Sequence, residues 1–183
     1  MSSENRSEDL IRLTYCSTAT FESSEGQGSV EREVARILME SRRNNPKFHI
    51  GGVLHYGNGY FFQALEGLRK PVNERYERIV ADNRHRKVEL LSVSKVNERM
   101  FPDWSMKYVA VETRIRDLLA RHGIQSFNPY GFDEDLCEEL MRCFVEEADE
   151  AEALPKAGDR KPVREEDTIR RKPSFLARLF GRT

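Results

Sequence analysis

The side chains in this sequence that are best suited to chemistry carry no charge. They are the phenol of Tyr15, the amide of Gln63, and the paired amides of Asn44 and Asn45. Gln63 lies inside an apolar run, where each buried polar group that stays unsatisfied costs about 1–3 kcal/mol. Taken alone, each of these side chains has an ordinary explanation. Gln63 could be a core glutamine bonded to backbone, Tyr15 a core tyrosine that reaches the rim, and the asparagines could end a helix. Together they indicate one amide-rich site.

Such a site favours binding and switching over hydrolysis. It offers no catalytic carboxylate, no His–Cys pair and no metal cluster, so we predict neither catalytic residues nor a metal ion. Amides suit the carbonyl and ring-nitrogen edges of a flat heterocycle. A glutamine amide has both donors and an acceptor, so it can reverse its hydrogen bonds by turning over. Tyr15 and Gln63 are therefore the candidate switch.

Apolar periodicity and turn signals predict the elements that must position these residues. Pro46 helps to end the helix that carries the asparagines, and Gly57-Asn58-Gly59 is typical of a type I′ hairpin turn. In chain order we expect a half-buried strand at 10–16, a helix from Ser29 to Asn45, strands at 50–56 and 60–66, a helix at 71–84, and strands at 87–96 and 105–111. The second helix is expected to turn Val72, Tyr76, Ile79 and Val80 inward.

The order of these elements indicates a fold. The first six match the ferredoxin-like split β-α-β unit, in which right-handed crossovers place the first and third strands side by side at the sheet centre. Tyr15 ends the first strand and Gln63 lies on the third, so phenol and amide meet if both point toward the helices. We predict an α+β fold: a ferredoxin-like β-α-β-β-α-β-β sheet with two helices on one face, plus C-terminal helices and a disordered tail.

The last predicted strand carries a pair of large side chains. Trp104 and Met106 lie two residues apart, so they share a face of that strand. Ordinary packing explains each of them. Methionine also fills gaps adaptably and tryptophan can change between buried and exposed positions, so the pair is a candidate movable reporter.

After Val111 the pattern becomes helical and the charge becomes uneven. We expect helices at 113–122, ended by Gly123, and at 133–150, with Asp133 near the N-cap. Residues 133–152 hold ten acidic residues and one basic residue, whereas residues 156–183 hold nine basic and four acidic ones. The predicted regions are a compact domain at 8–112, a helical extension at 113–152, and a basic tail at 153–183 that is solvated and disordered. Alternatively, the tail folds back on the acidic segment or reaches an anionic membrane or a partner.

Composition narrows the function classes. Hydrophobic residues make up 38% of the chain and charged residues 33%, which allows a soluble core, and the net charge of −1 gives no reason to expect nucleic-acid binding. Cys16, Cys137 and Cys143 lack metal-site spacing and are expected to be reduced thiols of a cytoplasmic protein. The polar start predicts no signal peptide, and no apolar run approaches the ~20 residues of a membrane span.

Four stretches of the sequence resemble the BLUF family, the sensors of blue light that use flavin adenine dinucleotide (FAD). They are LIRLTYCS at 10–17, SRRNNP at 41–46, IGGVLHYGNGYFFQALEG at 50–67 and FPDWSM at 101–106. They occur in the family's order and spacing and cover about residues 8–112. The FFQALEG stretch, with the upstream tyrosine and asparagines, is the most specific of the four.

The resemblance implies a role for each candidate residue. Flavin would lie between the two helices over the sheet, and Tyr15 would donate an electron and a proton to it after excitation. Gln63 would bridge Tyr15 and flavin and rearrange, which shifts absorption slightly to the red. The implied cofactor-binding residues are Tyr15, Asn44, Asn45, Gln63, Arg84 and His85, and Trp104 and Met106 would relay the change to the outer face of the sheet.

Two positions depart from the family's pattern. His49 stands where the family usually has a small residue, and Gly51 stands where it has threonine or serine. His49 is either an exposed loop histidine or a residue that alters packing near flavin. Neither change removes a photochemical residue, so we expect an effect on tuning rather than on activity.

The output is expected to need another molecule. The sequence shows no cyclase or phosphodiesterase module, so it resembles short BLUF proteins, which bind a separate downstream signalling protein and commonly self-associate. We therefore predict a photoreceptor that is not an enzyme, that forms a homo-oligomer, and that binds no nucleic acid. The alternatives are a flavin-free ferredoxin-like interaction module, which is a degenerate sensor, and a flavin enzyme.

Overall fold

The computed structural model describes residues 9–21, 29–102, 105–109 and 112–153. Its strands are β1 (Leu10–Ala19), β2 (Gly51–Gly57), β3 (Tyr60–Leu68), β4 (His85–Lys95) and β5 (Lys107–Tyr108). Its α-helices are α1 (Ser29–Asn44), α2 (Arg69–Val80), α3 (Glu112–Arg121) and α4 (Glu134–Ala153). Two short 3-10 helices, η3 (Asn45–Phe48) and η4 (Pro129–Gly131), join them. The predicted basic tail lies almost wholly outside the described residues.

The five strands form one mixed sheet in the order β4-β1-β3-β2-β5. β1 pairs antiparallel with β3 and β4, β2 pairs antiparallel with β3, and β5 joins β2 in parallel. The prediction that the first and third strands are neighbours is confirmed, and the register sets Tyr15 directly opposite Gln63. Residues that face each other across a ladder point to the same side of the sheet, so the predicted meeting of phenol and amide follows from this register.

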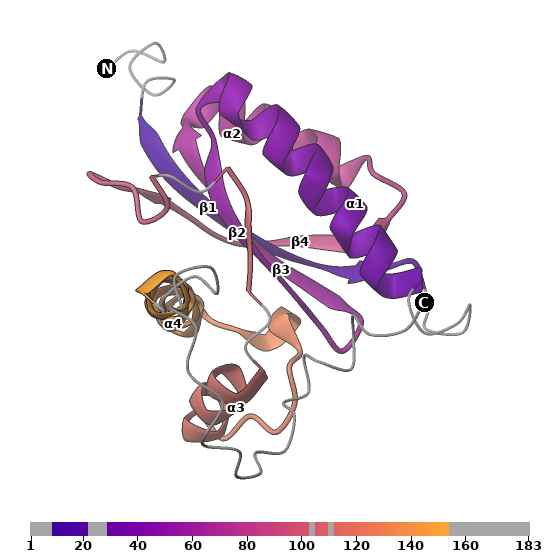
Figure 1. Ribbon diagram of the computed structural model, residues 1–183, viewed down its shortest axis with the longest axis vertical. Helices are drawn as coiled ribbons and strands as arrows, with labels where there is room; N and C mark the ends of the chain where they lie inside the picture. Colours follow the sequence, from indigo (N-terminus) through magenta and orange to yellow (C-terminus); the bar gives the residue numbers. More distant parts are fainter. Residues whose placement is uncertain (1–8, 22–28, 103–104, 110–111, 154–183) are drawn as a thin grey trace, which may run out of the picture. The chain divides into compact units, whose positions relative to one another are not determined.

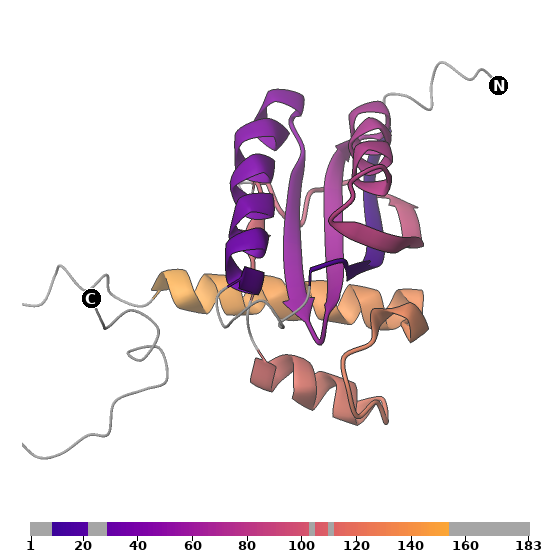
Figure 2. The ribbon, with the colours of Figure 1, turned by 90° about the vertical axis from the view of Figure 1, so that its right-hand side faces the viewer.

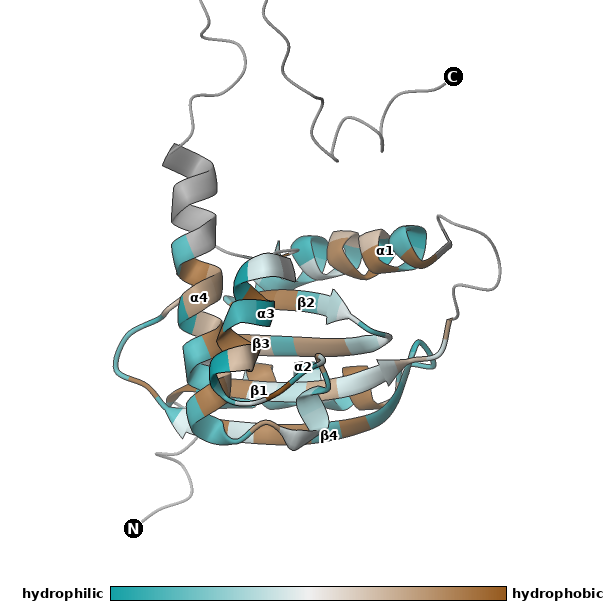
Figure 3. Cartoon of the chain, turned by 90° about the horizontal axis from the view of Figure 1, so that it is seen from below, coloured by the Kyte–Doolittle hydropathy of each residue, from teal (hydrophilic) through white to brown (hydrophobic). Residues whose placement is uncertain are grey.

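The sheet is covered on both faces. Helices α1 and α2 lie side by side on one face, and α3 and α4 lie on the other (Figures 1 and 2). Figure 3 shows apolar segments along the strands and on α4. The core under α1 and α2 includes Ile11, Leu13, Tyr15, Leu54, Phe61, Leu65, Val72 and Met106. The core under α3 and α4 includes Val53, Phe62, Ala64, Leu118, Leu136, Leu140, Met141 and Phe144.

The described residues correct several sequence predictions. The first strand is buried on both faces rather than half-buried, because α4 covers the face that the sequence pattern left open; Thr14 there donates to Met141 Sδ at 3.7 Å. The last strand has two residues instead of seven. The second helix ends at Val80 rather than at residue 84, and Val80 is 51% exposed rather than inward.

The predicted hairpin turn, the stop at Gly123 and the cap at Asp133 are confirmed. Asn58 and Gly59 both have positive φ, 52° and 81°, as a type I′ hairpin requires. Gly123 follows α3 with a φ of 71°. The Asp133 carboxylate accepts a hydrogen bond from Leu136 N at 2.9 Å, so it caps the start of α4.

Strand β4 is an irregular edge strand. Its register with β1 shifts twice, between Thr14 and Tyr15 and between Cys16 and Thr18. Lys87 lies at the second irregularity with a φ of 50°. The Tyr130 hydroxyl from η4 donates to Lys87 O at 2.8 Å, so the C-terminal part of the chain contacts this distortion.

A buried carboxylate anchors the loop between β4 and β5. Glu66 is fully buried and accepts from Arg12 Nε at 2.6 Å, from Met100 N at 3.1 Å and from Phe101 N at 2.8 Å. Arg99 adds two bonds, to Glu66 O at 3.0 Å and to His49 O at 2.7 Å. The chain is therefore held at the sheet before it continues toward Met106.

Candidate functional site

A cleft opens between α1 and α2 above β1 and β3. Its cavity volume is about 90 Å³, which is below the roughly 300–1,000 Å³ of most ligand pockets. The lining residues are Tyr15, Ile37, Glu40, Ser41, Asn44, Asn45, Gln63, Leu65, Arg75, Arg78, Ile79, Asp82, Arg84 and His85. All six residues predicted to bind a cofactor are among them, so the fold brings the set together; their contact with a cofactor stays a prediction.

The floor of the cleft is a chain of buried polar side chains. Tyr15 is fully buried and its hydroxyl donates to Gln63 Oε1. Gln63 in turn donates from Nε2 to Met106 Sδ at 3.3 Å. Burial raises the pKa of the Tyr15 phenol well above its ordinary value, so this proton stays on the hydroxyl at neutral pH.

Tyr15 and Met106, the two hydrogen-bond partners of the Gln63 amide, differ in their ability to donate a hydrogen bond. A phenol hydroxyl can donate or accept, whereas a thioether sulfur only accepts. Turning the amide over would keep a bond to Tyr15 with the roles reversed, but it would aim a carbonyl oxygen at Met106 Sδ, which cannot donate. Met106 therefore distinguishes the two orientations of the Gln63 amide, and any change of orientation also changes the contact with Met106.

Gly52 makes room for Met106 beside this site. An added Cβ at Gly52 would lie 2.3 Å from Ala64 O and 3.2 Å from the Met106 methyl. The backbone oxygen cannot move without separating β2 from β3. Gly52 was not among the predicted site residues, although its lack of a side chain lets Met106 reach Gln63.

The asparagine pair lies where α1 ends. Asn45 is 1% exposed and donates from Nδ2 to Ser105 O at 2.8 Å. Its Oδ1 is buried and has no hydrogen-bond partner among the described residues. Because an unpaired buried acceptor is costly, the cleft offers this oxygen to an N–H donor of a ligand. Asn44 is half-buried and lines the same cleft.

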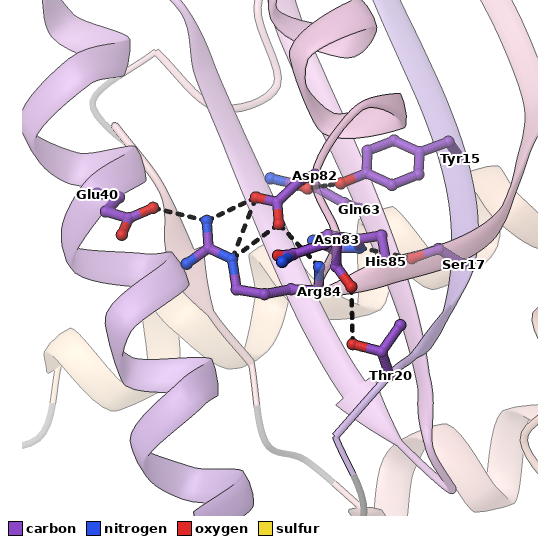
Figure 4. A network of polar contacts seen from close by, with 9 residues as sticks. All are labelled: Tyr15, Ser17, Thr20, Glu40, Gln63, Asp82, Asn83, Arg84 and His85. Carbon is purple, nitrogen blue, oxygen red and sulfur yellow. Dashed lines mark hydrogen bonds and ion pairs between the residues drawn. The ribbon is translucent and has the colours of Figure 1, made fainter.

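Arg84 joins the two sides of the cleft. It contacts the Glu40 carboxylate of α1 at 2.7 Å and the Asp82 carboxylate at 2.6 Å (Figure 4). The hydrogen bond to Asp82 is the main reason that the pKa of Arg84 lies above its ordinary value. Burial favours the neutral acid at Asp82, but the bonds and charge of Arg84 together lower the pKa of Asp82. Sequence reasoning identified Arg84 but missed both carboxylates; Glu40 lies on α1, 44 residues from Arg84.

His85 forms a buried neutral group beside Arg84. Its Nδ1 lies 2.8 Å from Ser17 Oγ, and its ring packs 4.7 Å from that of Phe61. Burial lowers the pKa of His85 to about 4. His85 is therefore uncharged at neutral pH, and its contribution to the cleft is a hydrogen-bonding ring rather than a cation.

Two further arginines of α2 line the cleft and were missed by sequence reasoning. No carboxylate of the described residues pairs with Arg75 or Arg78. Arg75 Nε is buried without a hydrogen-bond partner, and burial and the neighbouring Arg78 both lower the pKa of Arg75. Because Arg84 is already paired, Arg75 and Arg78 are the cations that the cleft leaves for an anionic group. Their spacing of three on a helix was the available signal.

The remaining predicted positions have separate outcomes. Trp104 lies outside the described residues, so its partnership with Met106 stays a prediction. Met106 is buried, but it precedes the two-residue strand β5. His49 is exposed with a φ of 53°, and it lines a different hollow from the cleft. Gly51 is buried opposite Glu66, also away from the cleft.

Other kinds of site receive no support from the described residues. Within them, no group of three or more His, Cys, Asp or Glu side chains could hold a metal ion. No helix in this part of the chain is long and apolar enough to cross a membrane.

The fold and the cleft define a class: a ferredoxin-like sheet with a ligand cleft between two helices and a buried tyrosine–glutamine–methionine chain at its floor. The family model of sensors of blue light using FAD matches residues 10–107. The chain therefore belongs to the BLUF family, and the matched region is a sensor module that uses FAD.

Relatives and solved structures agree with this membership. The beta subunit of a photoactivated adenylate cyclase from Euglena longa is 31% identical over 103 residues, which are 56% of this chain and 12% of that protein. The matched stretch therefore corresponds to about an eighth of that relative. The photo-activated state of BlsA has a TM-score of 0.68 and 30% identity, covering 74% of this chain and 94% of that one. The dark state of BlrB, a BLUF protein, has a TM-score of 0.62 and 28% identity, covering 77% and 98%.

Proposed function

We propose that this chain is a blue-light photoreceptor in which the Gln63 amide, held between Tyr15 and Met106, is the switch. The observation that carries the proposal is the buried chain from the Tyr15 hydroxyl through Gln63 to Met106 Sδ at the floor of the cleft. Membership of the BLUF family supports FAD as the ligand of that cleft.

The lining residues fit FAD on chemical grounds. The unpaired Asn45 Oδ1 suits a ring N–H, and Asn44 suits a neighbouring ring carbonyl. Arg75 and Arg78, which have no carboxylate partner among the described residues, suit the phosphate groups. Arg84 and His85 were expected to bind the cofactor. Since Arg84 is paired to two carboxylates and His85 is neutral, we assign them to shaping the cleft rather than to neutralising the phosphates.

Bound flavin would supply the blue-light chromophore and an acceptor for one electron. The protein's part is then hydrogen-bond control. The Tyr15 proton is held on a bond to Gln63, in a site that is fully buried. If the amide turns over, Tyr15 becomes the acceptor and the bond from Gln63 to Met106 is lost. This couples the state of the cleft to the segment that leads into β5.

We further propose that the output passes to a separate signalling protein and that the chain itself is not an enzyme. Relatives of this sensor include light-regulated adenylyl cyclases; a bacterial one is 34% identical with a TM-score of 0.53, over 62% of this chain and 33% of that chain. In the proposed arrangement residues 8–112 are the sensor, residues 113–152 form the output surface, and the cytoplasmic protein works as a homo-oligomer. The role of the basic tail in partner or membrane contact stays a hypothesis.

One absorption experiment separates this function from its alternatives. The purified full chain, supplied with FAD, should be yellow and should shift reversibly to the red under blue light. Gln63→Leu should remain yellow and lose the shift, whereas Gln125→Leu, at an exposed glutamine, should keep it. A normal shift in Gln63→Leu would refute the switch. Yellow wild-type protein without a shift would favour a flavin or redox protein, and colourless protein after FAD addition would favour the flavin-free module.

A further inference from the structure

Strand β2 carries a buried histidine on the sheet face opposite the cleft. His55 is 4% exposed. Its ring centroid lies 4.8 Å from that of Phe127, edge to face, and 5.8 Å from that of Phe144, nearly parallel. Phe144 belongs to α4 and is fully buried. His55 is therefore packed into the layer that holds the C-terminal helices.

The same imidazole also bonds to the chain that leaves β5. His55 Nδ1 lies 2.6 Å from the carbonyl oxygen of Val109. A carbonyl oxygen cannot donate, so Nδ1 carries the hydrogen and donates it. Val109 N donates to Leu54 O at 3.0 Å. Because the β2–β5 ladder includes only Lys107 and Tyr108, this side-chain bond is a substantial part of the attachment of β5 to β2.

The other end of this short segment is at the cleft. Met106 Sδ accepts the Gln63 amide, and Met106 O accepts from Arg42 Nε of α1 at 2.9 Å. Val109 follows Met106 by three residues, about 10 Å of extended chain. A displacement of Met106 along this segment therefore reaches the Val109 carbonyl without crossing another turn.

We propose that His55 is a positioning residue that couples β5 to α4. Its donor atom holds Val109 and its ring holds Phe144 and Phe127, so a movement that starts at Met106 is carried through the sheet to the C-terminal helical layer. The inference rests on the proposed function, in which the change at Gln63 is the input, and it names the route by which that change leaves the sensor.

Two substitutions separate the two halves of this contact. His55→Phe keeps a ring against Phe144 and removes the donor to Val109. His55→Asn keeps an amide donor near the position of Nδ1 and removes the ring. His122→Gln is the matched control, because His122 is exposed and pairs only with Glu139 at 3.1 Å among the described residues.

Each full-length, FAD-loaded variant would be measured twice, by light-minus-dark absorption and by light-minus-dark hydrogen exchange of peptides covering residues 134–153. The wild type and His122→Gln should show both a red shift and an exchange difference. His55→Phe should keep the red shift, and its exchange difference in α4 should fall at least twofold. His55→Asn should keep more than half of that difference.

The possible outcomes separate a failure of the His55 coupling role from a failure of the proposed photoreceptor function. A full exchange difference in His55→Phe, or a loss of the red shift in that variant, would overturn the coupling role. If His55→Phe does not fold, His55→Asn decides, since a normal red shift without the α4 exchange difference would contradict the donor's role. A wild type that shifts to the red with no change in α4 would overturn the inference alone, whereas a wild type without the shift would overturn the proposed function.

Discussion

The buried Glu66 carboxylate should be one of the largest single contributors to the stability of the sheet. Its partner guanidinium belongs to Arg12, and the two side chains are 0% and 11% exposed. Glu66→Gln keeps the volume but leaves one carbonyl oxygen for three donors: Arg12 Nε, Met100 N and Phe101 N. The amide oxygen can replace Oε1 or Oε2 but not both, so at least one of these N–H donors faces the new NH₂ group, and the nearly buried Arg12 guanidinium loses its counter-charge.

The expected cost follows from this geometry. Removing one partner of a buried ion pair costs roughly 3–5 kcal/mol. Because Arg12 keeps some contact with water, we expect the lower end of that range, about 3 kcal/mol. For a chain of this length, that corresponds to a fall in melting temperature of roughly 6–12 °C.

Urea unfolding followed by far-ultraviolet circular dichroism measures this loss directly. Glu138→Gln is the matched control, because the Glu138–Arg142 pair is solvent-exposed at 46% and 65% and should be worth less than about 0.5 kcal/mol. If the free energy of unfolding of Glu66→Gln lay within about 0.5 kcal/mol of that control, the carboxylate would not anchor the loop and the reasoning would be wrong.

Further predictions concern the cleft and its surroundings. Gly52→Ala should destabilise the fold by about 1–3 kcal/mol through overpacking, whereas Gly131→Ala, where nothing lies within 4 Å of the added Cβ, should be neutral by thermal melting. The pKa of His85 in the folded state, about 4, lies below its unfolded value of 6.5; the unfolded chain therefore binds the proton first, and stability should fall as pH drops from 6.5 toward 4. In a His85→Gln variant, the change in the free energy of unfolding over this pH range should be smaller by up to about 3 kcal/mol. A pH–stability curve parallel to that of the wild type would contradict this role of His85. Arg75→Gln and Arg78→Gln should each weaken FAD binding to the apoprotein by up to about tenfold, or 1.4 kcal/mol, and leave riboflavin binding unchanged in a fluorescence titration; equal losses for both flavins would contradict a phosphate role.

The central part of the site could be predicted because few residues decide it. The hairpin at Asn58-Gly59 is a local signal, and the order of the elements then places Tyr15 opposite Gln63. The cleft-lining face of α1 follows from helical spacing. Family resemblance then supplies the cofactor, which topology alone does not name.

The parts that were missed depend on contacts between distant elements. The last strand was predicted too long because Ser105 O and Met106 O are bonded by the side chains of Asn45 and Arg42 rather than by a neighbouring strand. The apolar periodicity of residues 105–111 is the same whether their backbone is bonded by side chains or by a neighbouring strand, so it could not reveal the difference.

The second helix was predicted too long because a local polar bond was not recognised. Apolar spacing does not reveal that the Asp82 carboxylate accepts from Arg84 N at 2.9 Å, a local bond that competes with the helical one. The burial of both faces of β1 likewise depends on α4, which lies more than a hundred residues later in the sequence.

The irregular strand β4 also decides how copies of this sheet can meet. A regular edge strand offers a row of unpaired N–H and C=O groups on which a further strand can grow. In β4 this row is broken by two register shifts and by the left-handed backbone conformation of Lys87. At the opposite edge of the sheet, β5 has only two ladder residues. Neither edge is a good template for lateral growth, so the homo-oligomer proposed above should assemble through helices or loops rather than by extending the sheet.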